Sequence, residues 1–132
     1  MSAEDNLIIY AGEGFDGTTL QYGWEIDSIP VNLTGYTARA QIRTAFNSVT
    51  SLASWTTENG KIVLGGALGT VTLVVPSTET SALWVAGLPL CGRVDGRSAY
   101  LLGYFDIELI PPSAAVRRFV HGEAWIIPEA TQ

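Results

Sequence analysis

The chain is poor in the residues that build disulfides and metal centres. It holds one cysteine, Cys91, and one histidine, His121, among 132 residues. A single cysteine excludes an intrachain disulfide, so the fold does not require an oxidising compartment. Zinc sites usually need three or four ligands, and no calcium-loop pattern is present, so we expect no metal and no cofactor. No cysteine-protease signature surrounds Cys91, and we expect a buried, inert thiol.

Positive charge and long apolar runs are also scarce. Seven Lys and Arg residues stand against thirteen Asp and Glu residues, for a net charge of −6. Such a surface repels phosphate groups, so we expect no nucleic-acid partner and no adhesion to an anionic membrane. No window approaches the roughly 20 apolar residues of a membrane span. The acidic residues 1–6 lack the basic start of a secretory signal, and we expect synthesis in a cytoplasm.

What the chain has in quantity is apolar residues, which make up 47% of the sequence. This content and length predict one domain over residues 1–132 with a single core. We expect residues 1–28 to form N-terminal strands or an arm, and residues 29–132 to form the core of the domain.

Residues 36–43 give the clearest structural signal, a strict alternation of two kinds of side chain. This period of two is typical of a half-buried antiparallel strand. One predicted face carries Tyr36, Ala38, Ala40 and Ile42, and the other carries Thr37, Arg39, Gln41 and Arg43.

Further short strands are predicted along the chain, separated by turns. They cover residues 7–11 (at a sheet edge), 18–26, 49–56, 62–64, 71–75, 99–110 and 116–127. Asn59-Gly60 predicts a type I′ hairpin that pairs residues 62–64 back onto 49–56. Residues 77–84, opening with Ser and Thr as caps, predict the one helix, and 85–98 a loop. This pattern predicts an all-β, immunoglobulin-like antiparallel β-sandwich of seven to eight strands with one short helix.

A glycine motif and a set of carboxylates are the two candidates for chemistry. Residues 12–17 spell GxGxxG, but strand formers follow where a nucleotide site needs a helix, so the pattern favours a turn. Asp106, Glu108 and Glu123 are candidates for general acid and base. Carboxylates that alternate with core residues more often lie on the solvent-exposed face of a strand. Here Arg117 on the neighbouring strand is a possible counter-charge. We therefore expect no catalytic residues and no enzyme activity.

Candidate contact residues come from a polar loop, a strand edge and aromatic side chains. The loop at residues 92–97 is interpreted either as a turn held by a local ion pair or as a contact loop. Among the four tryptophans, Trp24 and Trp55 are predicted to be core, and the positions of the others stay open. The candidate interface comprises Leu7, Ile8, Ile9, Tyr10, Trp84, Arg93, Asp95, Arg97, Arg117, Phe119, His121 and Trp125.

Several motifs follow one another in an order that resembles a known family. They are residues 33–43, 57–62, 69–73 with the helix at 77–83, 104–109 and 122–128. In this order they resemble small β-sandwich structural proteins of tailed bacteriophages, and are similar to the N-terminal domain of phage upper baseplate proteins. The loop at residues 86–98 is longer than the corresponding loop expected in that family.

The resemblance implies a non-enzymatic virion protein of the tail, baseplate or neck. Such a protein self-associates into a homo-oligomer or ring and docks a separate tail fibre, spike, or tube or neck protein. Its implied location is the virion, after synthesis in the host cytoplasm. A capsid decoration protein and a carbohydrate-binding module, which would use exposed tryptophans, are the alternatives that the sequence leaves open.

Overall fold

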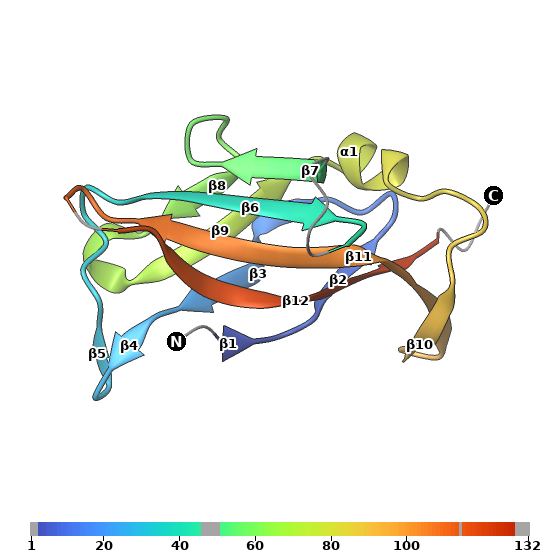
Figure 1. The fold of residues 1–132 in the computed structure, drawn as a ribbon, viewed down its shortest axis with the longest axis horizontal. Coiled ribbons are helices and arrows are strands. Elements are labelled where there is room, and N and C mark those ends of the chain that lie inside the picture. The colour runs from blue at the N-terminus through green and yellow to red at the C-terminus, as the bar shows by residue number, and fades with distance from the viewer. Residues whose placement is uncertain (1–2, 46–50, 114, 129–132) are drawn as a thin grey trace.

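The computed structural model describes residues 3–45, 51–113 and 115–128, and most of them lie in β-strands (Figure 1). Within this part the only α-helix is α1 (Ser77–Ala82), and a short 3-10 turn, η1 (Gly66–Leu68), lies between two strands. The protein is therefore all-β.

The larger sheet has seven strands with β11 near its centre. The strand order is β1-β12-β11-β6-β7, with β2 also paired to β12 and β10 also paired to β11. These strands are β1 (Ala3–Glu4), β2 (Leu7–Tyr10), β6 (Thr37–Arg43), β7 (Ser51–Thr56), β10 (Leu90–Val94), β11 (Arg97–Ile110) and β12 (Arg117–Ile127). β1 and β2 run parallel to β12, whereas the other pairs are antiparallel.

A smaller sheet lies behind the larger one in Figure 1. It contains β3 (Phe15–Gly23), β9 (Thr70–Val75) and β8 (Ile62–Leu64), in the order β3-β9-β8. A separate hairpin of β4 (Glu25–Ile26) and β5 (Ile29–Pro30) projects from one end of the molecule. The two sheets share one hydrophobic core, to which the larger contributes Trp55 and Ile107 and the smaller Val71 and Leu73.

The strongest predicted strands are confirmed. In β6, Ala38, Ala40 and Ile42 are buried while the alternate residues are more exposed. In β11, Phe105, Ile107 and Leu109 are buried and the residues between them are not. The strand predicted at residues 7–11 is β2, at the sheet edge, and Leu7, Ile9 and Ala11 belong to the common core.

The hairpin predicted at Asn59-Gly60 is wrong. β8 pairs with β9 while β7 pairs with β6, so this turn carries the chain from one sheet to the other. A type I′ turn needs a positive φ at both central residues, and here Gly60 has one (79°) but Asn59 does not. The Asn59 side chain stabilises the turn, because its Oδ1 accepts hydrogen bonds from the backbone N–H groups of Thr56 and Lys61, each at 3.0 Å.

The loop predicted at residues 85–98 contains a strand that the sequence interpretation missed. β10 pairs with the start of β11 through a tight turn at Asp95 and Gly96, whose φ angles are 52° and 75°. Two consecutive positive φ angles are the signature of the type I′ hairpin turn.

Two smaller expectations also have clear outcomes. The predicted helix is confirmed as α1, but its N-cap is Pro76, with no side-chain capping bond, instead of a Ser or Thr. β3 begins at Phe15, inside the glycine motif at residues 12–17, so the interpretation as a turn is wrong for its second half. A strand rather than a helix follows the motif, as expected. The first two residues of the strand predicted at 49–56 lie outside the described residues.

Candidate binding surface on the seven-stranded sheet

The outer face of the larger sheet collects polar side chains from its three central strands. Side chains alternate along a strand, so the residues between the core positions of β6, β11 and β12 point away from the core. Backbone register places Asp106 of β11 opposite Gln41 on β6 and opposite His121 on β12. The outer face is thus built around Asp106.

A β-bulge in β12 decides which of its residues reach this face. Ile107 pairs with Val120 and Glu108 pairs with Arg118, which leaves Phe119 without a partner in the register. A bulge inserts one extra residue and shifts the alternation of the strand. The Phe119 ring accordingly packs against the rings of Tyr22 and Trp24, at centroid distances of 6.3 and 6.0 Å.

The bulge corrects two expectations. The sequence predicted one strand face shared by Arg117, Phe119, His121, Glu123 and Trp125. This prediction is wrong for Phe119, because its ring packs against Tyr22 and Trp24. Arg117 was expected to be the cross-strand counter-charge of the carboxylates. That partner is Arg118 instead, whose Nε lies 3.7 Å from Asp106 Oδ2.

The carboxylates on this face are held by structural partners. Glu108 Oε1 lies 2.5 Å from Arg39 Nε in an ion pair. Burial raises the pKa of Asp106 above its ordinary value, the charge of Glu108 adds to this rise, and the positive charge of Arg118 opposes it. Glu123 Oε1 accepts a hydrogen bond from Trp125 Nε1 at 2.9 Å. Each of the three carboxylates on this face therefore has a side-chain partner within the protein.

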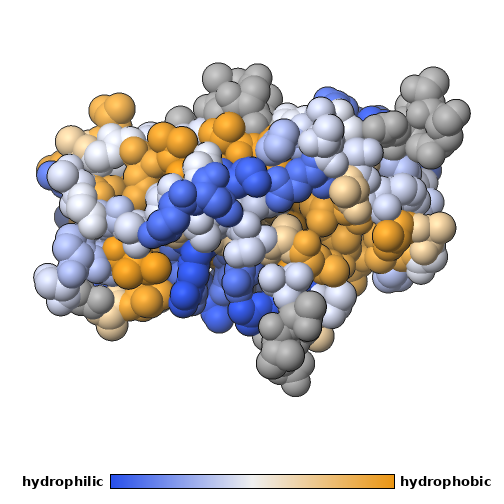
Figure 2. All heavy atoms as spheres, turned by 90° about the horizontal axis from the view of Figure 1, so that it is seen from above, coloured by the Kyte–Doolittle hydropathy of each residue, from blue (hydrophilic) through white to orange (hydrophobic). Residues whose placement is uncertain are grey.

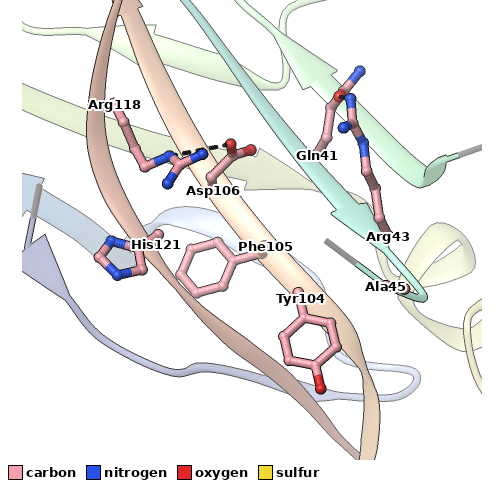
Figure 3. Close-up of a pocket in the computed structure, with 8 residues that line it drawn as sticks. All are labelled: Gln41, Arg43, Ala45, Tyr104, Phe105, Asp106, Arg118 and His121. Atoms are coloured by element: carbon pink, nitrogen blue, oxygen red, sulfur yellow. Dashed lines mark hydrogen bonds and ion pairs between the residues drawn. The ribbon is translucent and has the colours of Figure 1, made fainter. Parts of the chain in front are cut away.

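A small cavity of about 60 Å³ opens on this face (Figure 3). It is lined by Gln41, Arg43, Ala45, Tyr104, Phe105, Asp106, Arg118 and His121. Figure 3 shows the Gln41 and Arg43 side chains on one side of β11 and those of Arg118 and His121 on the other. The Arg43 Nη2 group donates to Gln41 Oε1, while Arg43 Nε is buried without a partner among the described residues. The volume suits about two water-sized groups.

A wider hollow of about 640 Å³ lies next to the small cavity. His121 and Tyr104 line both, and the wider hollow is otherwise lined by Glu4, Asp5, Asn6, Gly122 and Glu123. The small cavity therefore carries two arginines, and the wider hollow three carboxylates. Asp106 and Glu123, two of the candidate catalytic carboxylates, line different hollows.

The predicted contact loop is a turn anchored to the first strands. The Tyr10 hydroxyl donates to Asp95 Oδ2 at 2.7 Å, and this bond is the largest cause of the raised pKa of Tyr10. The Arg97 guanidinium lies over the Tyr10 ring, 5.7 Å from its centroid, and donates to the Pro128 carbonyl at 2.5 Å. Arg93 donates to the Gly96 carbonyl. Between the described residues no ion pair joins Asp95 to an arginine, so the local ion pair expected for this turn is wrong.

The remaining candidate contact residues are spread over the molecule. Leu7 and Ile9 are buried in the core, and Ile8 between them is half-buried. Trp84 packs edge-on against Tyr100 at 5.1 Å. Trp125 is half-buried, and its ring lies against Gly92, where an added Cβ would be 3.1 Å away.

Trp55 is fully buried, whereas Trp24 and Cys91, predicted to be core and buried, are only half-buried. Trp55 is 1% exposed, as predicted for a core residue, and its Nε1 donates to Glu79 Oε1 at 3.0 Å. Trp24 is half-buried and packs against the core. Cys91 is half-buried, its Sγ lies 3.4 Å from the Ala99 carbonyl oxygen, and burial raises the pKa of the thiol. A raised pKa keeps the sulfur protonated and weakly reactive.

The described residues contain neither a cluster of metal ligands nor a helix that could span a membrane. Across them, no group of three or more His, Cys, Asp or Glu side chains is placed to hold a metal ion. The helices of this part of the chain are too short or too polar to cross a membrane.

The sequence interpretation missed the exposed pair Ile26 and Ile29. These residues face each other across the β4–β5 hairpin and are 59% and 69% exposed. Asp27 and Ser28 between them have φ angles of 52° and 66°, which makes a type I′ turn without glycine. The signal in the sequence was two isoleucines on either side of a two-residue polar turn.

Comparison with known proteins gives no match to any protein-family model and none to a curated protein.

Proposed function

We propose that this chain is a non-enzymatic structural protein of a tailed-bacteriophage virion, located in the tail, baseplate or neck. In this proposal the all-β body is an immunoglobulin-like sandwich that associates with itself and docks a fibre, spike or other tail protein. The ordered motifs that resemble the phage family support it. In the structure those motifs lie in β6, the turn from β7 into β8, β9, α1, β11 and β12.

The observation that carries the proposal is the set of open strand edges on the larger sheet. In the described part of the chain, β2 pairs only with β12, and β7 pairs only with β6. Figure 2 views the molecule from the side of β7, where hydrophilic residues form a band between apolar patches. An open edge offers backbone N–H and C=O groups to an added strand from a neighbour. Leu7 and Ile9 already fill the core, so a neighbouring strand can meet the backbone of β2 without disturbing that core.

Immunogold labelling of intact particles tests the proposal. An antibody raised against the purified chain is applied to particles from a lysate of its source and viewed by electron microscopy. Label at the tail, baseplate or neck is expected. The matched control is the same antibody after absorption with the purified chain, which must abolish the label. Label over the head would replace the proposed location with that of a capsid decoration protein, and the absence of label on any particle would overturn the proposal.

A further inference from the structure

One end of the molecule concentrates exposed apolar side chains. Eight large hydrophobic side chains are exposed in the described part, and four of them are at this end. They are Ile26 (59% exposed), Ile29 (69%), Leu68 (70%) and Val116 (44%). Exposed apolar groups are ordinary when scattered singly, but a group of them marks an interaction surface.

Trp24 brings the three segments that carry these side chains together. Its backbone N–H donates to the Gly69 carbonyl, next to Leu68, and its carbonyl accepts from Val31 N–H, both at 2.9 Å. Its ring packs against Phe119, three residues after Val116. Figure 1 shows the same arrangement, with the β4–β5 hairpin, η1 and the β11–β12 connection at one end of the sheets. We call this surface the Trp24 end.

The Trp24 end also carries charges of both signs. Glu25 and Asp27 are exposed on the hairpin, and Arg117 and Arg118 are exposed at the start of β12. Arg117 forms no ion pair with another described residue, and Arg118 has only the 3.7 Å contact with Asp106. Acidic groups therefore lie on the hairpin and basic groups at the start of β12, at the same end of the molecule as the exposed apolar side chains. Apart from the contact of Arg118, these charges form no ion pair with another described residue.

The β4–β5 hairpin has little to stabilise it within its own chain. Each of its strands has two residues, and it forms its own two-stranded sheet. Two-stranded hairpins are marginally stable in water unless their apolar face packs against something. Ile26 and Ile29 are directly opposed and so lie on one face, which remains exposed to solvent.

We propose that the Trp24 end binds the Trp24 end of a second copy of this chain about a twofold axis. In a twofold contact the same patch is used on both molecules, so the patch must be complementary to itself. An apolar centre with acidic groups on one element and basic groups on another meets that requirement. Ile26 and Ile29 pack against the partner copy's apolar centre, and Glu25 of each copy faces Arg117 of the other. This inference rests on the self-association in the proposed function and assigns it a surface.

Sedimentation equilibrium of the purified full chain over a range of concentrations tests the contact. We expect a dimer for the natural sequence, and a dissociation constant at least about tenfold higher for the variant Ile26→Ser with Ile29→Ser. The matched control is Leu90→Ser, because Leu90 is 65% exposed on β10 at the opposite end of the molecule. Circular dichroism and thermal unfolding establish that each variant is folded.

Charge reversal supplies a second, independent test. Glu25→Lys alone and Arg117→Glu alone are each expected to weaken the dimer, and the double variant is expected to restore it. A monomeric natural chain, or a dimer that the isoleucine variant leaves unchanged or that Leu90→Ser weakens equally, would overturn this contact. Such a result would leave gold label on the particles in place, whereas loss of the label would overturn the virion role and leave the dimer intact.

Discussion

Gly122 on β12 lies directly against the backbone of Asp5: a Cβ at position 122 would be 1.9 Å from the Asp5 carbonyl oxygen. The missing side chain lets the segment between β1 and β2 approach β12. Asp5 N–H donates to the His121 carbonyl at 2.9 Å, and Asn6 Oδ1 accepts from Glu123 N–H at 3.2 Å. Gly122 therefore fixes the first strands to the sheet and shapes the wider hollow beside His121.

Gly122→Ala is expected to destabilise the fold by about 2–4 kcal/mol, because the added methyl group meets backbone atoms that cannot rotate away. Urea unfolding followed by tryptophan fluorescence measures this loss. Gly23→Ala is the matched control, since nothing lies within 4 Å of a Cβ there, and we expect a change within about 0.5 kcal/mol. Equal effects of the two substitutions would contradict the role given to Gly122.

The strands predicted well are those in which a regular alternation matches burial. β6 and the second half of β11 keep a period of two because one face packs on the core and the other is solvated. The alternation placed Asp106 and Glu108 on the solvated face of β11, but it did not give their register with β12, which puts His121 opposite Asp106. The local pattern was thus enough to predict which face of β11 these carboxylates share, but not their partners on the neighbouring strands.

The features missed depend on choices that local patterns do not determine. The bulge at Phe119 places Arg118 beside Asp106, and it is stabilised by ring contacts with Tyr22 and Trp24 from a distant segment. β8 pairs with β9 in the smaller sheet and not with β7, a choice of long-range partner that the local turn signal does not determine. The Asp95-Gly96 turn was a readable signal, but the surrounding prolines and glycines favoured a loop.

Tyr22 predicts a loss of stability in alkali. Burial, with a smaller contribution from the negative charge of Asp5, raises the pKa of Tyr22 from 10.0 to about 12. The phenol loses its proton first in the unfolded chain, so its contribution to stability is complete below about pH 10 and is lost as the pH rises through about 12. The expected loss is about 2 kcal/mol, and urea unfolding at a series of alkaline pH values measures it.

Tyr22→Phe is the control for this prediction, because it keeps the ring that packs against Phe119 and removes the titrating hydroxyl. We expect the variant to lose less stability than the natural chain between about pH 10 and 12. Identical alkaline profiles for the two proteins would show that Tyr22 does not cause the loss.

The ionised form of Asp106 is expected to destabilise the fold, although the carboxylate forms an ion pair with Arg118. Its pKa is raised, chiefly by burial and then by the charge of Glu108, so the folded protein favours the protonated acid. That contribution to stability is present below the ordinary pKa of 3.8 and is lost as the pH rises through the folded value. Near neutral pH the ionised carboxylate is therefore a net cost, because the attraction of Arg118 at 3.7 Å is weaker than the penalty of burial.

Asp106→Asn, which resembles the protonated acid in shape, is expected to raise the free energy of unfolding at about pH 7 by less than about 1 kcal/mol. The gain should disappear at about pH 3, where Asp106 itself is protonated. Glu108→Gln is the matched control: it breaks the 2.5 Å ion pair with Arg39, and we expect a loss of about 0.5 kcal/mol near neutral pH. Urea unfolding at both pH values measures the two variants. A loss of stability in Asp106→Asn at about pH 7 would show that Arg118 outweighs burial on this sheet face.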